Sequence, residues 1–173
     1  NPPANVSDLR AFEILAQRLP VNAVSVTSHL LRTHQTLESI ENSGLKIKKP
    51  LIDKRLGEQD FGDWVGKTYD EAQKLFGEPY NQFWLAPVSE KPPNGESFLE
   101  VLERVQTCVR ELTLKFKGED IICVAHGGPI RAALALALDL NGDQAMSFSI
   151  DNLSTTVIDY IHPENGFHGG WRV

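Results

Sequence analysis

The chain has 173 residues and a mass of 19.3 kDa; 41% of its residues are hydrophobic and 23% are charged. This length is enough to bury one sizeable core, so we expect a single domain over residues 1–173. The net charge of −6 and the pI near 5.3 argue against nucleic acid or an anionic membrane as the main partner, and no segment has the length and apolarity of a membrane span.

The first third of the chain alternates between helix and strand patterns. Ser7 is expected to cap a helix over 8–19, and a β-branched run over 23–27 predicts a strand. A second helix is expected over about 30–42, with Gly44 as its stop. A further strand is expected over 46–51.

The middle of the chain is less regular. Residues 56–66 have no clear period and predict a structured loop rich in glycine and aromatic side chains. Thr68 and Glu71 form a capping box, which predicts a short helix ending at Gly77. The next segment, 78–96, contains four prolines and three aromatic residues, which favours a long irregular connection folded back as a lid.

The last part of the chain returns to a regular pattern. Ser97 and Glu100 form a second capping box that opens the strongest helix, which Gly118 ends. We expect its apolar stripe to be buried, and this stripe consists of Leu99, Leu102, Val105, Val109, Leu112 and Phe116.

The order of the elements predicts the fold class. A strand over 121–125, a helix to about 138 and a β-rich run over 155–161 follow the long helix. Strands that alternate with helices predict a three-layer α/β/α sandwich around a central, mostly parallel sheet. Ligands bind such sheets at the carboxyl ends of the strands.

Both cysteines are expected to be buried. Cys108 falls in a helical pattern and Cys123 in an apolar strand, so a disulfide is not expected and a reducing, cytoplasmic location fits best. The sequence begins at Asn1 without a methionine, which leaves a removed signal or an earlier structural element open.

A histidine stands at the junction between the apolar run 120–125 and the helix after it. His126 is followed by Gly127, Gly128 and Pro129. Glycines allow backbone N–H groups to approach a ligand closely, the helix N-terminus is partly positive, and a protonated imidazole would add a full charge. This pattern predicts an anion site, although a lone histidine there could also be a structural cap.

Two other segments supply candidate polar groups. Arg32 lies in the first turn of the helix that follows the strand over 23–27. A solvated arginine is the simplest interpretation, but an early cation opposes the helix dipole and therefore needs an anionic partner. Glu58 lies in the glycine-rich loop and could act as a general acid, although Asp60 and Asp63 are equal candidates when taken alone.

Four segments together match one family in order and spacing. Residues 28–36 resemble S-P-L-x-R-A-x-Q-T, and residues 56–66 resemble L-x-E-x-x-F-G-x-W-E-G. Residues 94–97 are similar to the end of P-G-G-E-S, and 124–127 to V-x-H-G. The chain thereby resembles the histidine phosphatase superfamily, which is also called phosphoglycerate mutase-like.

The resemblance implies a role for each candidate. Arg32 would clamp the phosphoryl group, His126 and the Gly127 N–H would hydrogen-bond it, and Glu58 would donate a proton to the leaving oxygen. The implied activity is a metal-independent phosphomonoester hydrolase that acts through a phosphohistidine on a small phosphorylated metabolite, without a cofactor. No cluster of His, Cys and Asp residues has metal-ligand spacing either.

One departure from the family bears on catalysis. The R-H-G segment, whose histidine is the family's nucleophile, is not among these residues, and we expect it upstream of Asn1. The four histidines besides His126 are expected on the surface or behind the site. His29 stands where the family has proline, and Val65 where it has glutamate.

Other functions stay open at this point. A cofactor-dependent phosphoglycerate mutase-like phosphotransferase and a noncatalytic phosphate-binding module are the alternatives. The connection from Gly66 to Ser97 has only about thirty residues, and this short length favours the phosphatase over the mutase. An α/β-hydrolase is disfavoured because the segment around Ser97 lacks the second glycine of G-x-S-x-G. The physiological substrate is not evident from the sequence, nor is the oligomeric state, for which a homodimer stays open.

Overall fold

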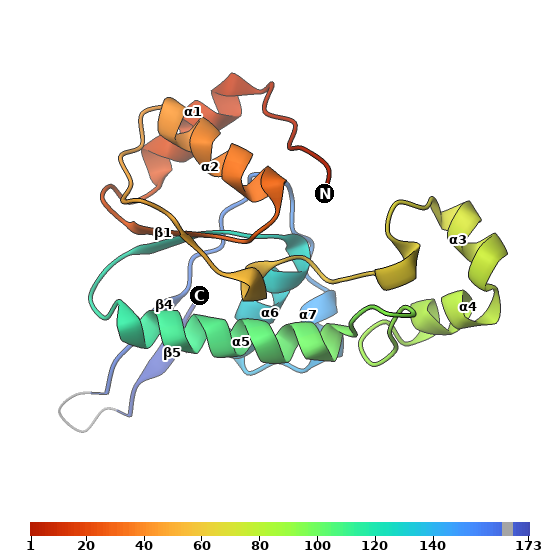
Figure 1. Ribbon diagram of the computed structural model, residues 1–173. Coiled ribbons are helices and arrows are strands. Elements are labelled where there is room, and N and C mark those ends of the chain that lie inside the picture. The colour runs from red at the N-terminus through yellow and green to blue at the C-terminus, as the bar shows by residue number, and fades with distance from the viewer. Residues whose placement is uncertain (164–167) are drawn as a thin grey trace.

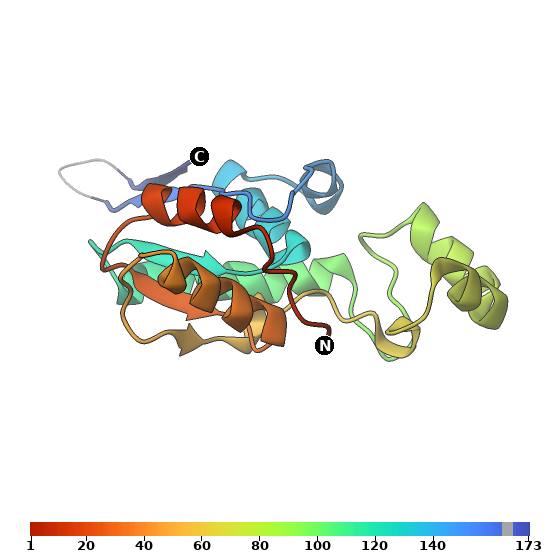
Figure 2. The same ribbon diagram turned by 90° about the horizontal axis from the view of Figure 1, so that it is seen from above.

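A parallel sheet between two helical layers forms the body of the protein (Figures 1 and 2). The computed structural model describes residues 1–163 and 168–173. Its main sheet has the order β2-β1-β3, and both pairings are parallel. The strands are β1 (Val24–Thr27), β2 (Leu51–Ile52) and β3 (Ile121–Val124).

Each face of the sheet is covered by helices. Val24 and Val26 of β1 pack into a core with the two helices below the sheet in Figure 1, α5 (Phe98–Lys115) and α6 (Gly127–Leu138). Ile122 of β3 packs on the opposite face with α1 (Leu9–Arg18) and α2 (Leu31–Asn42). This arrangement confirms the predicted sandwich and its parallel sheet.

Two expectations at the N-terminal side of the chain were wrong in detail. Asp8, not Ser7, caps α1, because its carboxylate accepts the Ala11 N–H at 3.0 Å while the Ser7 hydroxyl donates to Asn5. The strand expected over 46–51 is limited to the two residues of β2. Residues 46–50 include three lysines and Pro50, and a proline lacks the N–H that a strand ladder needs.

The long helix α5 begins at the predicted capping box. Ser97 accepts the Glu100 N–H, and the Glu100 side chain accepts the Ser97 N–H. Leu102, Val105 and Leu112 are buried as predicted, but Leu99 is 49% exposed. The buried face is shifted toward positions that the sequence pattern missed, namely Phe98, Val101 and Cys108.

The two cysteines differ in exposure. Cys108 is fully buried on α5, and burial raises the pKa of its thiol to about 12. Cys123 was expected to be buried but is exposed. It lies on β3, which is an edge strand of the described sheet, so no further strand shields it on the outer side.

The middle of the chain forms a helical hairpin that stands apart from the sheet (Figures 1 and 2). It consists of α3 (Tyr69–Phe76), which starts at the predicted Thr68–Glu71 capping box, and α4 (Glu78–Leu85). The irregular connection expected over 78–96 was therefore wrong for its first half. Pro79 lies in the first turn of α4, where a missing N–H costs no helical hydrogen bond.

The C-terminal part contributes a small separate sheet. The β-rich run expected over 155–161 is a strand only at β4 (Asp159–Ile161), which pairs antiparallel with β5 (Gly170–Arg172). A short helix, α7 (Gly142–Met146), follows α6. Within the two described ranges, no helix has the length and apolarity needed to cross a membrane.

Candidate active site

Two predicted site residues meet at the carboxyl edge of the sheet. His126 follows β3 and caps the N-terminus of α6, while Arg32 is the second residue of α2, which follows β1. The Arg32 Nε–H donates to His126 Nδ1 at 3.2 Å. Because β1 and β3 are parallel neighbours, their carboxyl ends place these side chains at the same edge.

The other nitrogen of His126 contacts a buried hydroxyl. His126 Nε2 lies 2.8 Å from Ser28 Oγ, which also accepts the Leu30 N–H at 3.1 Å. Ser28 Oγ lies 3.1 Å from Thr33 Oγ1, and Thr33 Oγ1 lies 2.8 Å from the Leu30 carbonyl oxygen, to which it donates. A guanidinium can only donate, so Nδ1 is the acceptor and the neutral imidazole carries its proton on Nε2.

His126 is neutral near pH 7. Its side chain is buried, and burial together with the positive charge of Arg32 lowers the imidazole pKa to about 4. The full positive charge considered for a protonated His126 is therefore absent near neutral pH. Arg32 and the N-terminus of α6 supply the positive potential at this corner.

Glu58 reaches the same helix N-terminus from the glycine-rich loop. Its Oε1 accepts the Gly128 N–H at 3.1 Å and the Gln59 N–H at 3.0 Å. A Cβ at Gly128 would lie 2.5 Å from that oxygen, so a side chain there would displace the carboxylate from its present position. The first N–H of α6 belongs to Gly127, and the first N–H groups of a helix have no partner inside it.

A cleft of about 1080 Å³ runs along this region, and both Arg32 and Glu58 line it. Asp60 also borders the cleft, whereas the Asp63 carboxylate accepts a hydrogen bond from Asn94 at 3.1 Å. Of these three loop carboxylates, Glu58 alone hydrogen-bonds to the start of α6 in the part of the chain that the structure describes. The geometry thus distinguishes Glu58 from Asp60 and Asp63, which are equal candidates when the loop sequence is taken alone.

The remaining histidines occupy other places. His29 lines the cleft beside Gly57, and His34 Nδ1 lies 3.5 Å from Thr27 Oγ1. His162 packs edge-on against Tyr160 in the C-terminal hairpin. Over residues 1–163 and 168–173, no group of three His, Cys, Asp or Glu side chains could hold a metal ion.

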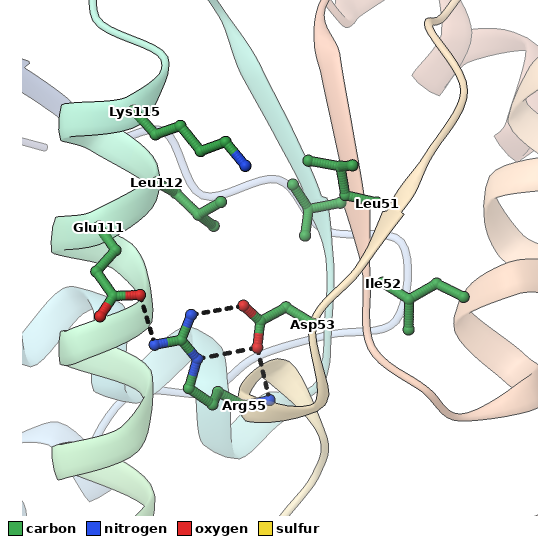
Figure 3. A pocket seen from close by; sticks show the side chains of 8 residues that line it. Leu51, Ile52, Asp53, Arg55, Glu111, Leu112 and Lys115 are labelled. Carbon is green, nitrogen blue, oxygen red and sulfur yellow. Dashed lines mark hydrogen bonds and ion pairs between the residues drawn. The ribbon is translucent and has the colours of Figure 1, made fainter.

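A second, smaller pocket of about 250 Å³ lies between β2 and α5 (Figure 3). There the Arg55 guanidinium points at two carboxylates, with nitrogen to oxygen distances of 2.7 Å to both Asp53 and Glu111. The hydrogen bond from Arg55 lowers the pKa of Asp53 to about 2. These charges satisfy one another, so we interpret the cluster as a joint between the loop and α5.

Sequence reasoning did not identify three supporting residues. Ser28 was only a letter of a motif, and Thr33 stands where that motif has alanine, although a short polar residue at the buried end of a strand is a usable signal. Arg104 was not singled out. It lies three residues after Val101 and four before Cys108, on the buried side of α5, where a charged residue needs partners.

Comparison with known proteins identifies the family. The model of the histidine phosphatase superfamily (branch 1) matches residues 7–169. The chain is 33% identical over 129 residues to the 2,3-bisphosphoglycerate-dependent phosphoglycerate mutase of Nitrobacter hamburgensis, a match that covers 71% of the chain and 61% of that enzyme. It spans only 39% of the length of some other curated relatives.

Solved structures agree with this assignment. YhfR of Bacillus stearothermophilus superposes with a TM-score of 0.82 at 28% identity, covering 100% of this chain and 83% of that one. The mycobacterial glucosyl-3-phosphoglycerate phosphatase Rv2419c, solved with VO3, superposes with a TM-score of 0.74 at 28% identity, covering 95% and 79%. The resemblance noted in the sequence is confirmed, and the chain belongs to the histidine phosphatase superfamily, branch 1.

Proposed function

We propose that this chain forms the phosphate-binding and proton-donating part of a phosphomonoester hydrolase, which acts on a small phosphorylated metabolite through a phosphohistidine. The observation that carries the proposal is the meeting of Arg32, His126 and Glu58 at the start of α6. A guanidinium, a helix N-terminus and a carboxyl group are the parts that metal-independent phosphoryl transfer needs.

The reaction divides into two steps. In the first, an imidazole nitrogen attacks phosphorus, the P–O ester bond breaks, and Glu58 in its protonated form gives its proton to the leaving oxygen. In the second, water attacks the phosphohistidine, Glu58 takes a proton back, and the N–P bond breaks. Arg32 and the Gly127 N–H neutralise the phosphoryl oxygens in both steps. His126, which the resemblance implies as a hydrogen-bond partner of the phosphoryl group, has both ring nitrogens engaged by Arg32 and Ser28 in this arrangement, so we assign it the role of holding the Arg32 guanidinium in place through Nδ1.

We infer that the nucleophilic histidine lies on a strand upstream of residue 1. Among the described strands β3 pairs only with β1, so its outer edge offers unpaired backbone groups to a further strand. A parallel strand added there would end beside His126. The R-H-G segment of the family, which ends such a strand, fits this position.

Hydrolysis is favoured over mutase chemistry by two observations. One of the similar solved structures is that of a phosphatase, Rv2419c, and it was determined with VO3. The connection from Gly66 to Ser97 is also short, with about thirty residues. The 33% identity to a phosphoglycerate mutase makes phosphotransfer the alternative to test.

The test uses the complete protein with a radiolabelled phosphomonoester and with p-nitrophenyl phosphate. Samples are quenched in alkaline detergent, because the N–P bond of phosphohistidine survives alkali and not acid. We expect an alkali-stable, acid-labile label together with release of inorganic phosphate. Transfer of the label to monophosphoglycerate without phosphate release would indicate a mutase. Phosphate binding without label or hydrolysis would indicate a noncatalytic module.

A further inference from the structure

Arg104 of α5 reaches across to the loop that carries Glu58. Its guanidinium donates to the backbone carbonyl oxygen of Arg55 and, at 3.3 Å, to that of Glu58. The same guanidinium binds the Glu96 carboxylate in a two-pronged contact, with Nε to Oε1 at 2.8 Å and Nη2 to Oε2 at 2.7 Å. Both side chains are about one-fifth exposed, so these contacts are largely shielded from water.

The contacts leave Arg104 little capacity to bind a ligand. A guanidinium has five N–H groups, and the four contacts just described use four of them. Arg104 and Glu96 border the cleft, but their charges are directed at each other and at the loop backbone. This distinguishes Arg104 from Arg32, whose Nε contacts only the neutral His126 among the described residues.

Glu96 fixes the same loop from its other side. Its Oε2 accepts the Asp60 N–H at 3.0 Å, and its backbone N–H donates to the Asp60 carbonyl oxygen at 2.9 Å. The Gln59 side chain donates to the Glu96 carbonyl oxygen at 2.9 Å. Residues 55–60 are therefore held on both sides of Glu58.

We propose that Arg104 and Glu96 are positioning residues for the proton donor, a proposal that rests on the function proposed above. Their contacts fix the backbone of the Glu58 loop while the Gly128 N–H fixes the carboxylate, so the acid is held at both ends. Proton transfer requires hydrogen-bond distance between donor and leaving oxygen, and a displacement of about 1 Å can lower a rate about 100-fold.

The test compares two esters of similar shape. Phenyl phosphate has a poor leaving group that needs a proton, whereas p-nitrophenyl phosphate has a good one that does not. For Arg104→Met in the complete protein we expect kcat/KM to fall about tenfold for phenyl phosphate and no more than about twofold for p-nitrophenyl phosphate. Glu96→Gln, which keeps the shape of the side chain, should also lower kcat/KM more for phenyl phosphate than for p-nitrophenyl phosphate, by smaller factors than Arg104→Met.

Two further variants test whether the effect of Arg104 depends on Glu58. In a Glu58→Gln background, Arg104→Met should add no selective loss on phenyl phosphate, because the acid it positions is gone. Arg55→Met is the matched control, since Arg55 lies at the start of this loop and is also a partly buried arginine that pairs with carboxylates (Figure 3). It should lower the unfolding temperature without selectivity between the esters.

The outcomes separate this inference from the proposed function. If Glu58→Gln is not selective, the role of Glu58 as acid is wrong. The positioning role is wrong if Glu58→Gln is selective but Arg104→Met and Glu96→Gln lower kcat/KM equally for both esters. It is also wrong if Arg55→Met is as selective as Arg104→Met. If Arg104→Met does not fold, Glu96→Gln and the Glu58→Gln/Glu96→Gln pair decide the question alone.

Discussion

The two sides of the candidate site are held by different parts of the fold. On the phosphate side, Arg32 and His126 follow the ends of two paired strands, and their positions come from the sheet. On the acid side, Glu58 lies on a loop that is fixed by side chains of distant segments. A site can thus combine one half set by topology with another half set by long-range polar contacts.

The difference predicts distinct kinetic signatures. In the proposed reaction, groups on the phosphate side act on the phosphoryl oxygens, which are the same in every substrate. A group on the acid side would act on the leaving oxygen, whose need for a proton varies from ester to ester. Variants on the two sides should therefore be told apart by their dependence on the leaving group.

The largest effect is expected for Arg32→Met. Loss of the guanidinium removes the main positive charge from the phosphoryl oxygens, and we expect kcat/KM to fall about 10³-fold for phenyl and p-nitrophenyl phosphate alike. Steady-state kinetics of the complete protein measures this. Arg10→Met, which removes an exposed arginine of α1 that pairs with Glu13, is the control and should behave as the parent. Selectivity between the esters in Arg32→Met would place Arg32 on the acid side instead.

Glu58→Gln should give the opposite signature. The amide cannot donate a carboxyl proton, so we expect a loss of about 100-fold for phenyl phosphate and less than about threefold for p-nitrophenyl phosphate. The pair of substrates is measured at one pH with the same enzyme preparation. Asp63→Asn is the control, because Asp63 contacts Asn94 and not α6. Equal losses for both esters would leave Glu58 with a positional role only.

The same difference explains what the sequence could predict. His126 was found because a strand end and a helix start are visible as local patterns, and parallel strands bring such ends together. Arg32 lies at a similar place, but its local pattern favoured a solvated arginine and the family resemblance gave it a role in the site. Arg104 was not found, because its acceptors on Arg55 and Glu58 are 49 and 46 positions away in the chain. No local period encodes a contact of that kind.

Errors in the predicted fold have similar causes. Pro79 was counted among the prolines that favoured an irregular connection over 78–96, but in the first turn of α4 it is tolerated. Cys123 was expected to be buried from its apolar neighbours, although exposure depends on whether another strand lies beside β3. In both cases the local residue type was known, and its position in the tertiary structure decided the result.

Acid should destabilise the phosphate side at a higher pH than the loop joint. The pKa of His126 is lowered from 6.5 to about 4 in the folded protein, so below pH 6.5 the unfolded chain binds an additional proton. The stability that the neutral His126 contributes is complete above pH 6.5 and is lost as the pH falls to about 4, which lowers the free energy of unfolding by about 3 kcal/mol. The pKa of Asp53 falls from 3.8 to about 2, so its contribution is lost only below pH 4.

Denaturant unfolding at several pH values measures this difference. His126→Asn should be less stable than the parent at pH 7 but should lose less stability between pH 6.5 and pH 4. Asp53→Asn should keep the parent's pH dependence in that window and differ from it only at lower pH. Identical slopes for His126→Asn and the parent would mean that His126 is not held neutral by its surroundings.

The smallest effect is expected for Ser28→Ala, and it tests why the phosphate side is rigid. Removal of the hydroxyl leaves His126 Nε2 and the Leu30 N–H without their buried partner, which should lower the free energy of unfolding by about 1–2 kcal/mol. The imidazole can then move its proton to Nδ1 and lose the contact from Arg32, so kcat/KM should fall about tenfold for both esters.

Ser25→Ala provides a matched control on the same strand. Ser25 is also fully buried in β1, but its hydroxyl has no hydrogen-bond partner among the described residues, so its removal should be neutral or stabilising. Nitrogen NMR of the His126 ring distinguishes the tautomers directly. If Ser28→Ala keeps the proton on Nε2 and the parent's activity, β1 and β3 alone orient the imidazole. The phosphate side would then depend on the sheet without help from its polar network.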